Sequence, residues 1–123
     1  MKNITIIGAY GALKELSMLK LPMKTAYAVY KMLRKADECY NFFIAEERKL
    51  IEKYNGEVDP TTGRISFKDA DANMAFQMEY AELHNLDIDW DLAPVCLNLD
   101  VLSDDCKLTP SDFAALAEFI TVE

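Results

Sequence analysis

A long segment without glycine or proline constrains the fold of this chain more than any other feature. It extends from Met23 to Tyr54, and within it apolar residues recur at alternating spacings of three and four. This spacing predicts a single amphipathic α-helix with an a/d heptad seam. The seam comprises Ala26, Val29, Leu33, Ala36, Tyr40, Phe43, Glu47, Leu50 and Tyr54.

A helix of this length would extend roughly 45 Å at about 1.5 Å per residue, which is more than the core of a small domain needs. We therefore expect part of the seam to remain exposed and to contact a partner or a second copy of the chain. The residues predicted for this oligomer seam are Val29, Leu33, Ala36, Tyr40 and Phe43.

Two shorter elements are expected before the long helix. The β-branched isoleucines within residues 1–7 predict a strand. Over residues 9–19 the apolar spacing becomes helical, which predicts a short amphipathic helix. Pro22 should end it, because proline restricts the residue before it and lacks a backbone donor.

The segment after the long helix begins with turn residues. Residues 59–63 have a sequence typical of turns, which predicts a short hairpin or an ordered loop. Asp69 is placed to cap a second helix over residues 70–85. Folded back, this helix would cover the C-terminal half of the long one as an antiparallel pair.

Two alternating segments and a final helix complete the prediction. Residues 86–92 and 95–101 alternate apolar with polar side chains, which predicts two strands. Thr109, Pro110 and Asp112 form a helix start for a helix that runs to about residue 120. The expected fold is one α+β domain over residues 1–123, a long antiparallel helical hairpin with a small sheet and short capping helices.

Charge is divided unevenly along the chain. Residues 1–55 carry ten Lys/Arg and six Asp/Glu, whereas residues 56–123 carry three and fifteen, so balances of +4 and −12 make up the total of −8. An acidic half repels phosphate backbones and acidic membranes, and it attracts basic surfaces such as the nucleic-acid clefts of other proteins. This pattern indicates a protein that acts by contact rather than by catalysis.

Acidic residues are most regularly spaced at Asp87, Asp89 and Asp91. On a strand their carboxylates would lie about 7 Å apart, close to the phosphate spacing along a DNA strand. Imitation of nucleic acid is one interpretation, and an edge that discourages aggregation is the other. A calcium loop is excluded, because its sixth and twelfth positions hold Leu92 and Asn98. The predicted partner-binding residues are Asp87, Asp89, Asp91, Asp100, Asp104 and Asp105.

One candidate basic patch lies on the long helix. Three interpretations are open: contact with RNA or DNA, pairing with the acidic half of a second copy, or an ordinary solvated face. The total charge of −8 argues against avid nucleic-acid binding. Tyrosines on the same helix could stack on bases, but core packing accounts first for those in the seam. The patch comprises Lys24, Lys31, Arg34 and Lys35.

The sequence contains no catalytic or cofactor motif. Residues 8–11 lack the third glycine of a dinucleotide fingerprint and the lysine of a P-loop. His84, the only histidine, has no nearby nucleophile to activate. Cys39, Cys96 and Cys106 have no C-x-x-C spacing, which leaves a disulfide framework unsupported, with a zinc site from Cys96, Cys106 and His84 as an alternative. We expect no enzyme activity, cofactor or metal.

Several segments together resemble a known family. In their order along the chain, they resemble a small uncharacterised family encoded by phages and prophages of Gram-positive bacteria. The resemblance covers most of the chain. Residues 95–98 depart from it, because they are less polar than the corresponding stretch expected in that family. The resemblance implies a phage-like origin and no particular chemistry. The segments are Ala9-Tyr10-x-Ala12-Leu13-x-x-Leu16, Lys20-Leu21-Pro22 with Ala26, the run from Glu46 to Tyr54, Leu86-Asp87-Ile88-Asp89 and Leu108-Thr109-Pro110-Ser111-Asp112-Phe113.

Two functions are consistent with these features. The first is an anti-CRISPR-like inhibitor whose acidic half occupies the basic cleft of a host nuclease, without direct binding of nucleic acid. The second is a phage structural or assembly accessory that self-associates through the long helix. Because the N-terminus lacks the apolar region of a signal peptide and no apolar stretch is long enough to span a membrane, we expect either protein to work in the host cytoplasm.

Overall fold

The computed structural model describes residues 1–102 and 107–123. It combines helices with two small two-stranded sheets, which confirms the predicted α+β class. The elements in chain order are α1 (Asn3–Ser17), α2 (Met23–Lys53), β1 (Glu57–Val58), β2 (Ile65–Ser66), α3 (Ala70–His84), β3 (Val95–Leu97), the 3₁₀ helix η1 (Leu99–Val101), α4 (Pro110–Ala115) and β4 (Ile120–Val122).

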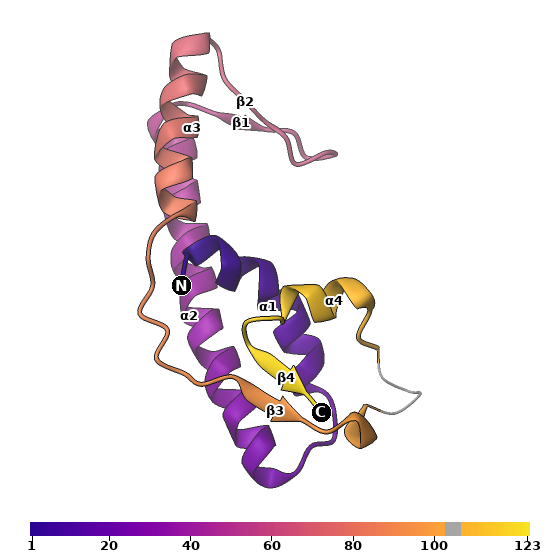
Figure 1. The fold of residues 1–123 in the computed structure, drawn as a ribbon. Helices are drawn as coiled ribbons and strands as arrows, with labels where there is room; N and C mark the ends of the chain where they lie inside the picture. Colours follow the sequence, from indigo (N-terminus) through magenta and orange to yellow (C-terminus); the bar gives the residue numbers. More distant parts are fainter. Residues whose placement is uncertain (103–106) are drawn as a thin grey trace.

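Helix α2 spans the length of the molecule, with the other elements gathered around its two halves (Figure 1). It begins directly after Pro22, as predicted. At its C-terminus the N–H of Gly56 donates to the carbonyl of Ile51 and the N–H of Asn55 to that of Glu52. This is a Schellman motif, and its left-handed residue is Asn55, with a φ of 52°, rather than the adjacent glycine.

The main core lies between α1 and the N-terminal half of α2, covered by α4 and by the β3–β4 sheet (Figure 1). Small side chains such as Ala9 and Ala36 are fully buried there, which allows the two helices to approach closely. The core residues are Ile6, Ala9, Ala12, Leu13, Leu16, Val29, Met32, Ala36, Cys39, Val95, Leu97, Leu116, Phe119 and Ile120.

The predicted N-terminal strand is wrong, because α1 already begins at Asn3. Its start is satisfied by backbone groups far along the chain: the N–H of Asn3 donates to the carbonyl of Leu86 at 2.8 Å, and the Asn3 side chain donates to that of Leu83 at 3.2 Å. Burial of Ile6 on the helical face outweighs the modest helix preference of the isoleucines. Only an isolated bridge between Lys2 and Asp87 has strand character here.

The β3–β4 sheet also differs from the prediction. Residues 86–92 form no strand, and β3 covers only the first part of the expected second strand. Its partner is β4, paired in parallel from Val95 opposite Ile120 to Leu97 opposite Val122. The last helix starts with the predicted capping box of Thr109 but ends at Ala115, so the chain is free to form β4.

The second half of α2 carries α3 and the β1–β2 hairpin, which projects to one side (Figure 1). Of the two alternatives predicted for residues 59–63, a hairpin or an ordered loop, the structure has the hairpin, and its strands are antiparallel. Asp69 caps α3 as predicted, its carboxylate accepting from the N–H of Ala72 at 2.7 Å. Phe76 is buried, with its ring centroid 4.8 Å from that of Phe67, which directly follows β2.

Candidate functional site

The three regularly spaced aspartates lie on the connector, residues 85–94, which joins α3 to β3 and runs beside α2 (Figure 1). The carboxylate of Asp87 lies 2.9 Å from the N-terminal amino group of Met1. The carboxylate of Asp91 lies 2.7 Å from Nζ of Lys35, whose hydrogen bond holds the pKa of Asp91 below its ordinary value. Asp87 and Asp91 therefore form ion pairs that link the connector to the N-terminus and to α2.

Residues 86–92 form no strand, so the three exposed carboxylates do not stand on the strand that was expected to space them. Asp89 is exposed, and its carboxylate has no partner among the residues that the structure describes. Asp100 is exposed on η1, which follows β3, whereas the connector precedes that strand. Asp104 and Asp105 lie outside the described residues.

Other acidic side chains remain available to a partner. Within residues 57–102 and 107–123, seven carboxylates are exposed and form no ion pair or hydrogen bond with a described residue. They are distributed over the hairpin, α3, the connector, η1 and the C-terminal segment. They are Glu57, Asp71, Glu82, Asp89, Asp100, Glu118 and Glu123.

The heptad seam is covered within the chain. Val29, Ala36 and Phe43 are at most 5% exposed, and Leu33 and Tyr40 are half-buried. Helix α1 covers the first part of the seam and α3 the last part. The expectation that part of the seam stays exposed is wrong, because the two flanking helices together match the length of α2.

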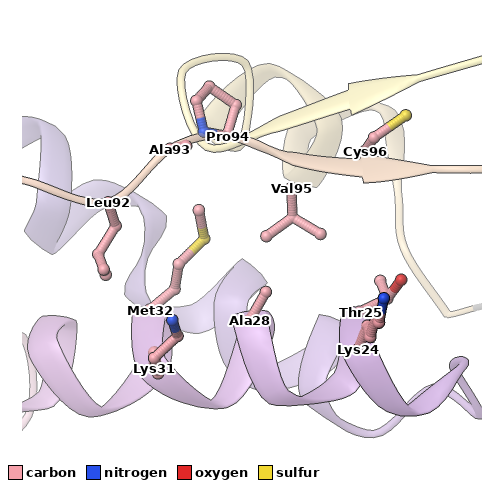
Figure 2. Close-up of a pocket in the computed structure, with 10 residues that line it drawn as sticks. All are labelled: Lys24, Thr25, Ala28, Lys31, Met32, Leu92, Ala93, Pro94, Val95 and Cys96. Carbon is pink, nitrogen blue, oxygen red and sulfur yellow. The ribbon is translucent and has the colours of Figure 1, made fainter.

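A groove of about 360 Å³ separates the N-terminal half of α2 from the segment around β3. Figure 2 shows Lys24 and Lys31 on its helical side, while Val95 points toward α2 and Cys96 points away from it. The thiol of Cys96 is exposed. Cys39 is buried, and burial raises the pKa of the Cys39 thiol. The groove is mainly apolar.

Exposed tyrosines and cations lie beside this groove on the same half of α2, with a contribution from α1, and Lys31 borders both surfaces. Tyr27 and Tyr30 are 59% and 53% exposed, and their ring centroids lie 6.1 Å apart. Nζ of Lys31 lies 5.2 Å from the centroid of Tyr27. We call this surface the tyrosine–basic face, and it comprises Tyr10, Lys14, Tyr27, Tyr30, Lys31 and Arg34.

A second groove, of about 410 Å³, runs along the tyrosine–basic face between α1 and α2. Tyr10 forms one wall: its ring stacks on Tyr40 at 4.4 Å, Nζ of Lys14 lies 4.6 Å from its centroid, and its hydroxyl donates to Asp37. That hydrogen bond raises the pKa of Tyr10. The role of Tyr10 is not visible in the sequence, because only the pairing of α1 with α2 brings it beside Tyr30.

The predicted basic patch is split by the fold. Lys35 turns toward the connector, where it contacts Asp91. Lys24 and Lys31 line the groove beside β3, whereas Arg34 lines the groove beside α1. The patch therefore serves two surfaces and one internal ion pair rather than a single site.

The groups considered for catalysis or metal binding are spread apart. His84 packs edge-on against Phe43 and Tyr80, and its Nδ1 lies 2.7 Å from the carbonyl oxygen of Tyr80. Cys106 belongs to the part of the chain outside the description. Among the residues that the structure describes, no group of three His, Cys, Asp or Glu side chains could hold a metal ion.

Comparison of the chain with family models, with curated proteins and with solved structures finds no match. Of the helices described, none has both the length and the apolar character that crossing a membrane requires.

Proposed function

We propose that this chain is a non-enzymatic binding protein that occupies a basic surface of its partner, namely the nucleic-acid cleft of a host nuclease, as anti-CRISPR-type inhibitors do. The seven exposed carboxylates that have no partner among the described residues carry the proposal. Charges left free in this way favour encounter with a basic partner and determine its orientation. The resemblance to phage-encoded proteins supports a bacterial nuclease as that partner.

Packed elements of the fold hold several of these carboxylates in place. In this proposal α2 and α3 act as one antiparallel helical hairpin that presents Asp71 and Glu82, while the connector presents Asp89. Glu47 and Phe43 of α2 contact Tyr80 of α3, so these helical carboxylates rest on a packed interface. A preordered acidic surface loses less conformational entropy on binding than a flexible tail would.

The partner is found by purifying the tagged protein from a Gram-positive host and identifying what is retained. A nuclease or its guide complex should dominate and should dissociate as salt rises from about 50 to about 500 mM, because surface charges are screened over this range. Inhibition of that nuclease is then measured with purified components. Retention of virion components alone, or inhibition that is insensitive to salt, would contradict the proposal.

Variants of the acidic surface separate binding from folding. Replacing Asp87 or Asp91 also removes an internal ion pair, so the informative variant is Asp89→Asn combined with Asp100→Asn. We expect at least a fivefold weaker association, with unchanged stability, at low salt. Glu52→Gln on α2, an exposed acid outside the acidic half, is the matched control and should bind normally.

Self-association as a phage assembly accessory is a second candidate, on a different surface from the one first expected. Met74 and Met78 are each 65% exposed, one turn apart on α3. Exposed apolar side chains in a row favour contact between proteins. Sedimentation of the wild type and of Met78→Asp tests this candidate, and a wild type that remains monomeric at about 100 µM would exclude it.

A further inference from the structure

The tyrosine–basic face lies within the most basic part of the chain. Residues 1–38 carry seven Lys/Arg and three Asp/Glu, a formal charge of +4, although the whole chain is at −8. These residues form α1 and the first half of α2, which pack on each other. The net charge of the molecule therefore does not describe this end of it, because charges beyond a Debye length of about 10 Å are largely screened.

Core packing does not account for the aromatic residues on this face. Tyr27 and Tyr30 are more than half exposed, and each is one turn away from a cation of the same helix, Lys31 and Arg34 respectively. Surfaces that bind single-stranded nucleic acid usually combine aromatic rings with cations. The rings stack on bases, and the cations attract phosphates.

The groove lined by Tyr30 has the size of a small-ligand site. Its volume of about 410 Å³ falls within the range typical of small-ligand sites, roughly 300–1,000 Å³. Lys14 and Arg34 stand on its two sides, and Asp37 holds the hydroxyl of Tyr10 so that this ring forms a fixed wall. The rings of Tyr27 and Tyr30 stack on each other and remain 59% and 53% exposed, so a base would extend this existing stack.

We propose that the tyrosine–basic face binds single-stranded nucleic acid, with bases stacked on Tyr27 and Tyr30 and phosphates held by Lys14, Lys31 and Arg34. Binding is tolerant of sequence, because every base presents a π face to a tyrosine ring. This site is separate from the carboxylates of the proposed inhibitory surface and does not depend on them. The acidic half of a second copy would match the charge of this face, but carboxylates would not stack on the exposed tyrosine rings as bases do.

The test is fluorescence anisotropy with labelled 15-mers of deoxythymidine and of uridine, at several salt concentrations. With about three phosphate contacts, the logarithm of the binding constant should fall with the logarithm of salt with a slope near −2, at about 0.7 per contact. Tyr27→Ala and Tyr30→Ala should each weaken binding by about fivefold or more, whereas Tyr30→Phe should bind like the wild type.

Matched controls lie farther along the same helix. Arg34→Gln should make the salt slope shallower by about 0.7, and Arg48→Gln should leave it unchanged. Phe42→Ala removes an exposed aromatic ring outside the face and should not affect binding. All these side chains are exposed, so thermal unfolding should be the same in every variant.

Three results would overturn the proposal. The first is the absence of binding at about 100 µM protein in about 50 mM salt. The second is binding that survives both tyrosine-to-alanine changes, since counterion release alone would then explain it. The third is a dimer in sedimentation that Arg34→Gln dissociates, which would assign the face to a second copy of the chain.

Discussion

Nζ of Lys35 in α2 lies 2.7 Å from Oδ1 of Asp91 in the connector, and the same ammonium group donates a hydrogen bond to the carbonyl oxygen of Asp89. It also lies 5.7 Å from the ring centroid of Trp90, which packs edge-on against Phe119. A single lysine therefore anchors three consecutive residues of the connector to the core.

Replacing Lys35 should loosen the connector without unfolding the rest of the molecule. We expect Lys35→Gln to shift the fluorescence emission of Trp90, the only tryptophan, to longer wavelength as its ring becomes hydrated. The free energy of unfolding should fall as well, because Asp91 loses its cation. Emission spectra and denaturant unfolding measure both effects.

The matched control is Lys49→Gln, which removes an exposed ion pair with Glu46 within α2. Such pairs contribute little, so this variant should keep the wild-type emission and stability. Identical Trp90 spectra for Lys35→Gln and the wild type would show that apolar packing alone holds the connector.

Elements specified by local chemistry were predictable from the sequence. Helix α2 follows from its heptad spacing, and the starts of α3 and α4 follow from the caps Asp69 and Thr109. Pairing over long distances was not predictable. Strand β4 forms because Ile120 pairs with Val95, 25 residues earlier in the chain. The sequence of residues 120–122 alone does not identify that partner.

The alternation of apolar and polar residues led to the wrong prediction of a strand in the connector. Ile88, Trp90 and Leu92 pack against the core while the aspartates between them face solvent, which gives the period-two pattern without a neighbouring strand. The same limitation applies to the candidate site. Exposed tyrosines on α2 were visible in the sequence, but the groove beside Tyr10 depends on how α1 packs.

Phe43 tests the burial of the seam. Its side chain is 5% exposed and contacts Tyr80 and His84 of α3, so Phe43→Ala should cost about 3–5 kcal/mol of unfolding free energy. Met78→Asp, on the exposed side of α3, should change stability by less than about 0.5 kcal/mol. Denaturant unfolding compares them, and a neutral Phe43→Ala would show that α3 does not cover this part of α2.

Gly8 distinguishes the observed start of the fold from the predicted one. A methyl group at Gly8 in α1 would meet nothing within 4 Å, so Gly8→Ala should stabilise the protein by about 0.5–1 kcal/mol if residues 3–17 are one helix. If residues 1–7 were a strand followed by a tight turn, the same change would destabilise it.

Gly56→Ala is the opposite case. Its Cβ would lie 2.8 Å from the ring of Phe67, which cannot move freely because it packs on Phe76. Overpacking of this kind should cost about 1–3 kcal/mol. Unfolding curves that place both glycine variants on the same side of the wild type would contradict the assigned packing.

Glu79 should give the contact between α2 and α3 a dependence on pH. The hydroxyl of Tyr54 and then Nζ of Lys53, at 2.9 Å, donate to its carboxylate, and these hydrogen bonds hold the pKa of Glu79 below its ordinary value of 4.5. The folded state thus favours the ionised form. Its contribution to stability is complete well above pH 4.5 and is lost as pH falls through the lower pKa of the folded protein.

Glu79→Gln removes this contribution at every pH, so the wild type should be more stable near neutral pH, and the difference should shrink as pH is lowered from about 6 to about 2.5. Asp59 and Asp91, whose pKa values are also lowered, titrate identically in both proteins and cancel from the comparison. A Glu79→Gln difference that persisted at the acidic end would mean that shape, rather than charge, joins these two helices.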